Sequence, residues 1–240
     1  RSLSDIRMLW NHNRGTGVFT TTVTGSIFAG NYRHPNADNR DHGALYNWGE
    51  GAGPIRSTVR DCVFSGNLQS FGSAVINRAI NASSVIDSSV SSSVFSGNSA
   101  TVRGGAVANG DFTWVDSGTI NSVLLGNVFA GNVAPAGGAI KNYTGARPLR
   151  VDMNGCTLVA NSGTSGGAIH QSTAGAGTIS TSLSGCILDG NSSGIESSGA
   201  GISTTVTYSD VQGGYAGTGN TSADPRFVAG PGAPLYTGEW

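Results

Sequence analysis

Lys141, His170 and Glu196 have side chains that can move protons or bind a polar ligand, and they recur at similar intervals. Each follows a small residue by two positions, as Tyr46 and Ile76 do earlier in the chain. If these positions lie on successive turns of one structure, an amine, an imidazole and a carboxylate stand in a row. Such a row could do acid–base chemistry or bind a glycan. The alternative is a solvated face with a few favourable cross-strand pairs, which we favour because no metal ligands accompany the row.

The other charged residues do not predict a catalytic centre. A calcium site needs several oxygen ligands close together, and a general base needs a pKa near the working pH. The fourteen acidic residues are spread along the chain, and Asp87, which aligns with Arg56 and Asn121, suits a surface pair. We therefore predict no catalytic residues, no metal site and no cofactor, and an enzymatic role is the less favoured alternative.

The four tryptophans, Trp10, Trp48, Trp114 and Trp240, fall outside the regular columns of the sequence. We expect them in loops or near the ends of the molecule. Aromatic side chains in such places can stack on sugars, but we favour packing of loops against the flank of the molecule.

An internal repeat must position all of these residues. Four segments share the pattern Phe-x-x-Asn, and two looser copies carry Leu in place of Phe. The copies span Phe28 to Asn31, Phe64 to Asn67, Phe95 to Asn98, Phe129 to Asn132, Leu158 to Asn161 and Leu188 to Asn191. A degraded seventh copy from Val206 to Val211 lacks the closing asparagine. A regular period of this kind indicates a repeat architecture.

Each repeat contains three strand-like segments. One ends in the Phe-x-x-Asn pattern, and a second, rich in small residues, ends in Asn47, Asn77, Asn109 and Asn142, and then in Gln171. The third alternates apolar or small residues with polar ones, which is typical of a strand with one buried face. We predict an all-β fold, a right-handed parallel β-helix of about seven coils with three short strands per coil. The helix should occupy residues 1–228 and an irregular tail residues 229–240.

The two columns of asparagines predict hydrogen-bonded ladders. A stacked side-chain amide can donate to one neighbouring coil and accept from the other, and asparagine tolerates the backbone of a tight corner. The predicted ladders comprise Asn31, Asn67, Asn98, Asn132, Asn161 and Asn191 in one column and Asn47, Asn77, Asn109 and Asn142 in the other. These residues should hold the coils together rather than take part in catalysis.

The three cysteines fall in a further column. Cys156 and Cys186 belong to consecutive coils, so their backbones should lie about one strand spacing, ~4.8 Å, apart. That separation permits a disulfide, although in-register parallel strands often aim the sulfurs poorly. We favour packed free thiols for this pair and leave the disulfide open, and Cys62 should be free.

The paired motifs Phe-x-x-Asn and Gly-Gly-Ala-Ile resemble the repeats of polymorphic outer-membrane proteins. The second motif reads Gly104 to Val107, Gly137 to Ile140 and Gly166 to Ile169. The segments Tyr208 to Gly214 and Ala223 to Val228 are similar to the closing part of many secreted β-helix proteins of the pectate-lyase-like superfamily. The resemblance covers nearly the whole chain and implies the fold, whereas that superfamily includes adhesins, fibre components and polysaccharide-cleaving enzymes. After Val228 the chain departs from the pattern, because Ala229 to Pro234 replace the usual final strand.

The composition excludes several other classes of protein. Glycine supplies 38 residues, charged residues make up 11% of the chain, and the net charge is −1. Disordered chains combine low hydrophobicity with high net charge, and nucleic-acid binding needs a basic face, so neither is predicted. No apolar stretch approaches the ~20 residues of a membrane span. The chain begins Arg-Ser-Leu, which suggests a processed product or a fragment.

These observations favour a noncatalytic extracellular or cell-surface protein, adhesin-like or fibre-forming. The ends of a solenoid expose unpaired strands, so we also expect copies to associate end to end. A glycan or another cell-surface ligand is a candidate partner. The alternative function is a polysaccharide lyase or a carbohydrate-binding β-helix, and the chain could also be the passenger of a larger autotransporter.

Overall fold

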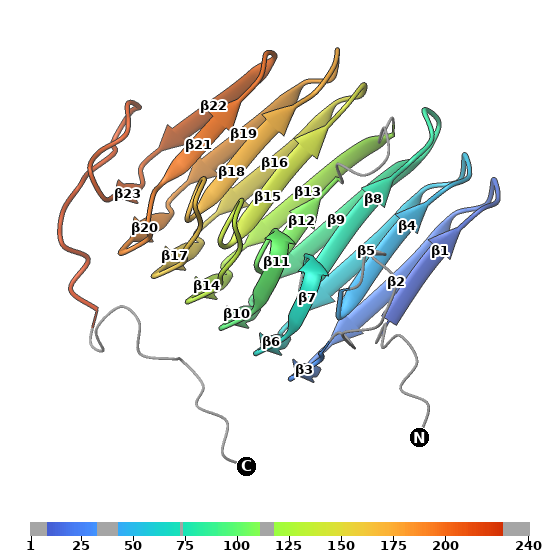
Figure 1. Ribbon diagram of the computed structural model, residues 1–240, viewed down its shortest axis with the longest axis horizontal. Helices are drawn as coiled ribbons and strands as arrows, with labels where there is room; N and C mark the ends of the chain where they lie inside the picture. Colours follow the sequence, from blue (N-terminus) through green and yellow to red (C-terminus); the bar gives the residue numbers. More distant parts are fainter. Residues whose placement is uncertain (1–8, 33–42, 73, 111–117, 228–240) are drawn as a thin grey trace.

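The computed structural model describes residues 9–32, 43–72, 74–110 and 118–227, so the tail predicted at 229–240 lies outside the described residues. Three long sheets each contain seven parallel strands, and the chain visits the sheets in turn (Figure 1). Successive coils follow one another along the longest axis, from β1 near the N-terminus to β22 and β23 at the other end. This is the predicted right-handed parallel β-helix of about seven coils.

The strands divide among the sheets as follows. Sheet A contains β1 (Leu9–Asn13), β4 (Leu45–Gly49), β8 (Val75–Ala79), β12 (Val107–Asn109), β15 (Ile140–Thr144), β18 (Ile169–Thr173) and β21 (Ile195–Ser198). Sheet B contains β2 (Phe19–Thr24), β5 (Ile55–Arg60), β9 (Val85–Ser91), β13 (Thr119–Leu125), β16 (Leu149–Asn154), β19 (Ile179–Ser184) and β22 (Ile202–Thr207). Sheet C contains β3 (Ile27–Ala29), β6 (Val63–Ser65), β10 (Val94–Ser96), β14 (Val128–Ala130), β17 (Thr157–Val159), β20 (Ile187–Asp189) and β23 (Asp210–Val211). A short fourth sheet pairs β7 (Leu68–Phe71) with β11 (Ser99–Arg103).

The alternation in sheet B determines which side chains enter the core. In β5 the residues Ile55, Ser57 and Val59 are buried, and the residues between them are exposed. The strands pair in register, so Ile55 lies beside Ile86 and Val59 beside Val90. A shift of one residue would exchange the two faces of the strand, so burial of this column specifies the register. The described part of the chain contains no helical segment with the length and apolar character of a membrane span.

Phenylalanines of the repeat form a stack through the N-terminal half of the core. Successive rings from Phe28 through Phe64 and Phe95 to Phe129 lie 4.8 Å apart between centroids and are nearly parallel. The strand register continues this column through Leu158 and Leu188 to Val211. One apolar column therefore runs from the first coil to the last, and its burial supplies hydrophobic stabilisation in every coil.

The first asparagine ladder is confirmed along its whole length. Each Nδ2 donates to the Oδ1 of the next asparagine, from Asn31 through Asn67, Asn98, Asn132 and Asn161 to Asn191, at 2.6–2.9 Å. Each Oδ1 that accepts this bond also accepts from the backbone N–H of the preceding asparagine. These side chains thus satisfy backbone groups that the corner would leave buried and unpaired.

The second ladder is also confirmed, and it begins one coil earlier than predicted, at Asn11. Asn11 donates to Asn47 at 2.7 Å, and the chain of bonds continues through Asn77 and Asn109 to Asn142 at 2.7–2.9 Å. The ladder ends there because the longer Gln171 accepts from Thr181 inside the core instead. The buried Asn142 Nδ2 has no hydrogen-bond partner in the part of the chain that the structure describes.

The residue before each asparagine of the first ladder adopts a left-handed backbone. Gly97 and Gly131 have φ of 59° and 61°, and Ala160 occupies the equivalent position before Asn161 with φ of 53°. Glycine adopts this conformation at little cost, whereas a Cβ crowds the following carbonyl oxygen. The corner therefore explains the Gly-Asn pair of the repeat, and Ala160 is a strained exception.

Candidate functional site

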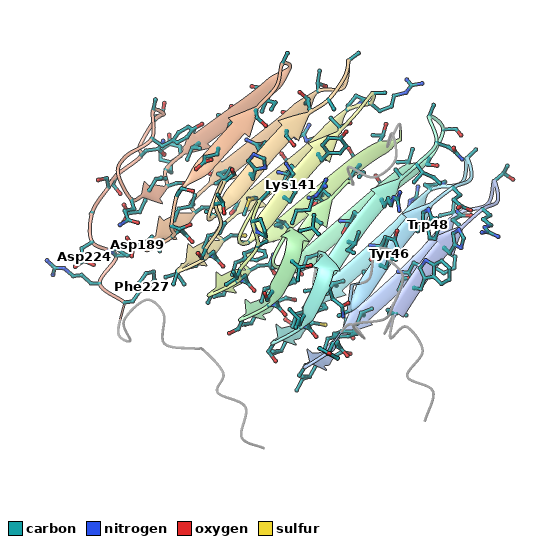
Figure 2. All side chains as sticks on the ribbon, viewed as in Figure 1. Tyr46, Trp48, Lys141, Asp189, Asp224 and Phe227 are labelled. Atoms are coloured by element: carbon teal, nitrogen blue, oxygen red, sulfur yellow. The ribbon has the colours of Figure 1, made fainter. Side chains whose placement is uncertain are left out.

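The outward face of sheet A holds the predicted row of chemically active residues. Lys141 lies beside His170, and His170 lies beside Glu196, on the adjacent strands β15, β18 and β21. The same column continues toward the N-terminal end through Ala108, Ile76, Tyr46 and Trp10. The register therefore brings the three predicted residues together. Figure 2 shows Lys141 in the middle of the rod, with Tyr46 and Trp48 closer to its N-terminal end.

Our expectation that this column faces solvent is wrong for most of its members. Lys141 is 1% exposed, and Tyr46, Ile76 and Ala108 are also buried. Part of the cover comes from turns that follow β7 and β11. A Cβ added to Gly72 or Gly104 would lie 2.9 Å from the Cβ of Ala108, so these two turns lie directly on the sheet. Sequence patterns within a strand cannot show such a cover, because it comes from another part of the coil.

Lys141 is the centre of a buried polar group. Its Nζ lies 2.6 Å from His170 Nδ1 and donates to Ser172 Oγ, and both partners are on β18. Burial, followed by the positive charge of Arg103, lowers the pKa of Lys141 to about 7. Burial, followed by the charge of Lys141, lowers the pKa of His170 to about 4, and the charge of Glu196 opposes this shift. At neutral pH the imidazole is therefore neutral and can accept a hydrogen bond from the lysine.

The Lys141 group has the parts of a nucleophile and its base. A lysine whose pKa is near neutrality can take a proton from a hydroxyl such as that of Ser172. Both side chains are buried, however, and the described structure leaves Lys141 almost without contact to solvent. A substrate could not reach the hydroxyl without displacing the cover, so this arrangement is better suited to filling the space under the turns than to catalysis.

A stacked aromatic group occupies the N-terminal end of the same face. The rings of Trp10 and Trp48 lie 5.6 Å apart, and His12 stacks against both at 4.8 and 4.6 Å. Tyr46 stacks on Trp48 at 5.7 Å, and the Arg78 guanidinium lies 5.8 Å from the centre of the Trp48 ring. Trp10 is 41% exposed and ends the stack. We refer to these five residues as the aromatic stack.

The aromatic stack corrects one sequence prediction. Trp10 and Trp48 lie near the N-terminal end of the rod, as one part of the prediction had it, but they lie in the strands β1 and β4 and within the columns of the repeat, not in loops. Trp114 and Trp240 lie outside the described residues. The sequence does contain a signal that could have located the stack: its aromatic residues occupy alternate positions of two strands, so they project from the same face of the sheet. Trp10 aligns with Tyr46, and His12 aligns with Trp48, when the second asparagine column is extended back to Asn11.

A charged group borders the aromatic stack. Glu50 lies 2.9 Å from His12 Nε2 and 2.7 Å from Arg14 Nε. Partial burial raises the pKa of Glu50, but hydrogen bonds from His12 and Arg14 outweigh it, so the net pKa is lowered. Glu50 is therefore ionised at neutral pH. The stack thus combines an exposed indole with carboxylate and guanidinium groups that can bind hydroxyls.

The cysteines are free thiols that complete backbone hydrogen bonding. Cys62, Cys156 and Cys186 are all buried, and none forms a disulfide. The Sγ of Cys156 donates to Leu124 O at 3.3 Å, one coil before it. A hydrogen bond with Cys156 lowers the pKa of Cys186 to about 7, and the same interaction raises the pKa of Cys156. The favoured interpretation, packed thiols in one column, agrees with this geometry.

Within the described residues, no group of three or more His, Cys, Asp or Glu side chains could hold a metal ion. Comparison with known proteins adds no relative: no family model, no curated protein and no solved structure matches this chain.

Proposed function

We propose that this protein is a noncatalytic extracellular scaffold, an adhesin-like or surface β-helix. The observation that carries the proposal is the continuous side-chain ladder that joins Asn31 to Asn191 through six successive coils. The residues that repeat most faithfully hold coils together and do not line a site. Solenoids of this kind use a rigid, elongated surface to present binding positions.

The proposed location outside the cell rests on the sequence motifs. The Phe-x-x-Asn and Gly-Gly-Ala-Ile repeats resemble those of polymorphic outer-membrane proteins, and the closing segment is similar to that of pectate-lyase-like proteins. We propose on this basis that the chain is exported. Labelling of intact cells with a membrane-impermeant carboxyl reagent tests the location, because carboxylates such as that of Asp61 are exposed whereas the single lysine, Lys141, is buried. Labelling equal to that of surface proteins is expected, and a chain labelled only after lysis would contradict it.

The noncatalytic part of the proposal is tested with a panel of acidic polysaccharides. Lyase turnover produces unsaturated uronates, which absorb in the ultraviolet, and calcium should be tested both present and absent. No turnover above a heat-denatured control is expected. Robust turnover that Lys141→Met abolishes would overturn the proposal and identify the Lys141 group as catalytic.

Carbohydrate binding is the second candidate, and the aromatic stack is the observation that favours it. An exposed indole can stack on the apolar face of a sugar ring, and Glu50 and Arg14 can bind its hydroxyls. A glycan array followed by calorimetry tests this function. Trp10→Ala should abolish any binding that uses the stack. The matched control is Tyr208→Ala, which removes an exposed aromatic residue at the opposite end of the rod.

A further inference from the structure

One residue of each coil lies at the corner between sheets B and C, and most of these side chains are buried. The seven positions are Ser26, Cys62, Ser93, Asn127, Cys156, Cys186 and Ser209. Where the next coil carries serine or asparagine, its side-chain oxygen accepts a backbone N–H from the coil before it. Cys62 N–H donates to Ser93 Oγ at 3.1 Å, and Cys186 N–H donates to Ser209 Oγ at 3.0 Å. The column is therefore a third ladder of side chains, which we call the corner ladder.

Sulfur takes the place of oxygen at two consecutive positions of the corner ladder. The backbone N–H of Asn127 donates to Cys156 Sγ, and the backbone N–H of Cys156 donates to Cys186 Sγ. A hydrogen bond also joins the two sulfurs. Cys62 is separated from Cys156 by two coils, which carry Ser93 and Asn127 in this column. Of the three cysteines in the chain, only Cys156 and Cys186 are therefore in contact.

The backbone at these two positions lies within reach of a disulfide. The flanking strands pair in register, β16 with β19 and β17 with β20, so the two Cα atoms lie about one strand spacing, ~4.8 Å, apart. Disulfides accept Cα separations of about 4.4–6.8 Å, but their Cβ atoms lie about 3.5–4.5 Å apart, so the stacked side chains must approach by about 1 Å. The preceding residues, Gly155 and Gly185, have φ of 60° and 61°, and a Cβ added at either meets no atom closer than 3.9 Å. The space beside both corners is therefore open to a small shift.

Cys186 is the more reactive thiol of the pair. The hydrogen bond from Cys156, together with backbone amides, lowers the pKa of Cys186, although burial opposes this shift. The thiolate is the form of cysteine that attacks a peroxide. Both thiols are buried, but each directly follows an exposed glycine, so no side chain shields the corner at that position. A small oxidant therefore has a short path to the sulfurs.

We propose that Cys156 and Cys186 form a redox site, in which hydrogen peroxide converts the two thiols into a disulfide that joins successive coils. The Cys186 thiolate attacks one peroxide oxygen, so an S–O bond forms, the O–O bond breaks and hydroxide leaves, which the proton released by Cys186 neutralises. The sulfur of Cys156 then attacks that of Cys186, so the S–S bond forms, the S–O bond breaks, and the hydroxyl leaves with the Cys156 proton as water. Two thiols are oxidised, and one peroxide is reduced to two waters. The proposal goes beyond the scaffold function and does not depend on it.

Treatment of the purified, folded chain with hydrogen peroxide tests the proposal. The peroxide is removed before the chain is unfolded and its thiols are counted with a chromogenic reagent. The count should fall from three thiols per chain to one, and the mass should fall by two hydrogen atoms. Peptide mapping without reduction should find Cys156 joined to Cys186, and dithiothreitol should restore all three thiols. Cys156→Ser should stop at a sulfenic acid on Cys186, which a sulfenic-acid-specific label detects.

Serine is the matched substitution, because serine already occupies three positions of the corner ladder. Cys62→Ser should form the disulfide as the wild type does, whereas Cys186→Ser should form none. A chain that keeps three thiols in excess peroxide while its circular dichroism remains that of the folded protein would overturn the proposal. A disulfide that includes Cys62, or a sulfinic acid on Cys186 beside a reduced Cys156, would overturn it too. Failure of the scaffold proposal would appear in the polysaccharide and labelling assays, not in the thiol count.

Discussion

Removal of one rung from the first asparagine ladder should destabilise the protein strongly. Asn132 Oδ1 accepts from Asn98 N at 3.1 Å and from Asn98 Nδ2 at 2.9 Å. Its Nδ2 donates to Phe95 O at 3.0 Å and to Asn161 Oδ1 at 2.9 Å. In Asn132→Ala, Asn98 Nδ2 keeps its bond to Phe64 O, and Asn161 Oδ1 keeps its bond from the backbone of residue 132. Asn98 N is left buried without a partner, whereas Phe95 O lies within the parallel pairing of β10 with β14 and keeps its strand hydrogen bond.

A buried group without a partner costs about 1–3 kcal/mol, so Asn132→Ala should lower the free energy of unfolding by about 1–3 kcal/mol. Urea denaturation followed by circular dichroism measures this change. The control is Asn154→Ala, which removes an exposed asparagine one coil away and should change stability by less than about 0.5 kcal/mol. A loss below about 1 kcal/mol for Asn132→Ala would refute the reasoning, because water or local rearrangement would then replace the ladder bonds.

Further changes should affect stability in directions that the structure fixes. Gly97→Ala should lower the free energy of unfolding by about 1 kcal/mol through backbone strain alone, because an added Cβ meets nothing within 4 Å. Ala160→Gly should raise the free energy of unfolding by up to about 1 kcal/mol, because it relieves the same strain. Thermal denaturation measures both changes. The pKa of His170 falls from 6.5 to about 4 on folding, so the folded state binds fewer protons between these values and loses stability as the pH falls through them. The loss should be about 1–2 kcal/mol after allowance for solvent screening, and urea midpoints from pH 7 to 4 should show a smaller dependence in His170→Gln. The pKa of Lys141 falls from 10.5 to about 7 on folding, so the free energy of unfolding should rise as the pH rises from 7 toward 10, and Lys141→Met should remove this rise. If either His170→Gln or Lys141→Met keeps the pH dependence of the wild type, the pKa shift assigned to that residue is contradicted.

The sequence predicts those parts of the fold that depend on stacking of like residues. Phe64, Phe95 and Phe129 are found at once by their spacing, and the in-register pairing follows from it. The ladders are predictable for the same reason, because one asparagine implies another in the next coil. The strand register then places Lys141, His170 and Glu196 side by side without any further information.

Contacts between different parts of a coil were not predictable. The burial of Lys141 depends on other segments of the coil, and turns such as that at Gly104, which press on the same sheet, have no alternating pattern. The hydrogen bond that Asn220 Oδ1 accepts from Ser209 N–H was not predicted. The described chain forms no strand of sheet A or sheet B between β23 and Asn220, so the repeat pattern does not extend to this residue. The break of the second ladder at Gln171 depends on Thr181, a partner across the core. In each case the missing information is tertiary.

The central claim is that residues one repeat apart occupy equivalent positions on successive coils. Pulsed electron–electron double resonance, which measures the distance between two spin labels, tests this claim directly when the labels are placed in one outward column of sheet B. Thr58 is separated from Ser182 by four strand pairings and from Thr205 by five, which gives backbone separations of about 19 and 24 Å at the usual strand spacing. With the buried cysteines changed to serine, the second pair of labels should be longer than the first by about one spacing, ~5 Å. Equal distances, or a second distance shorter than the first, would contradict the β-helix.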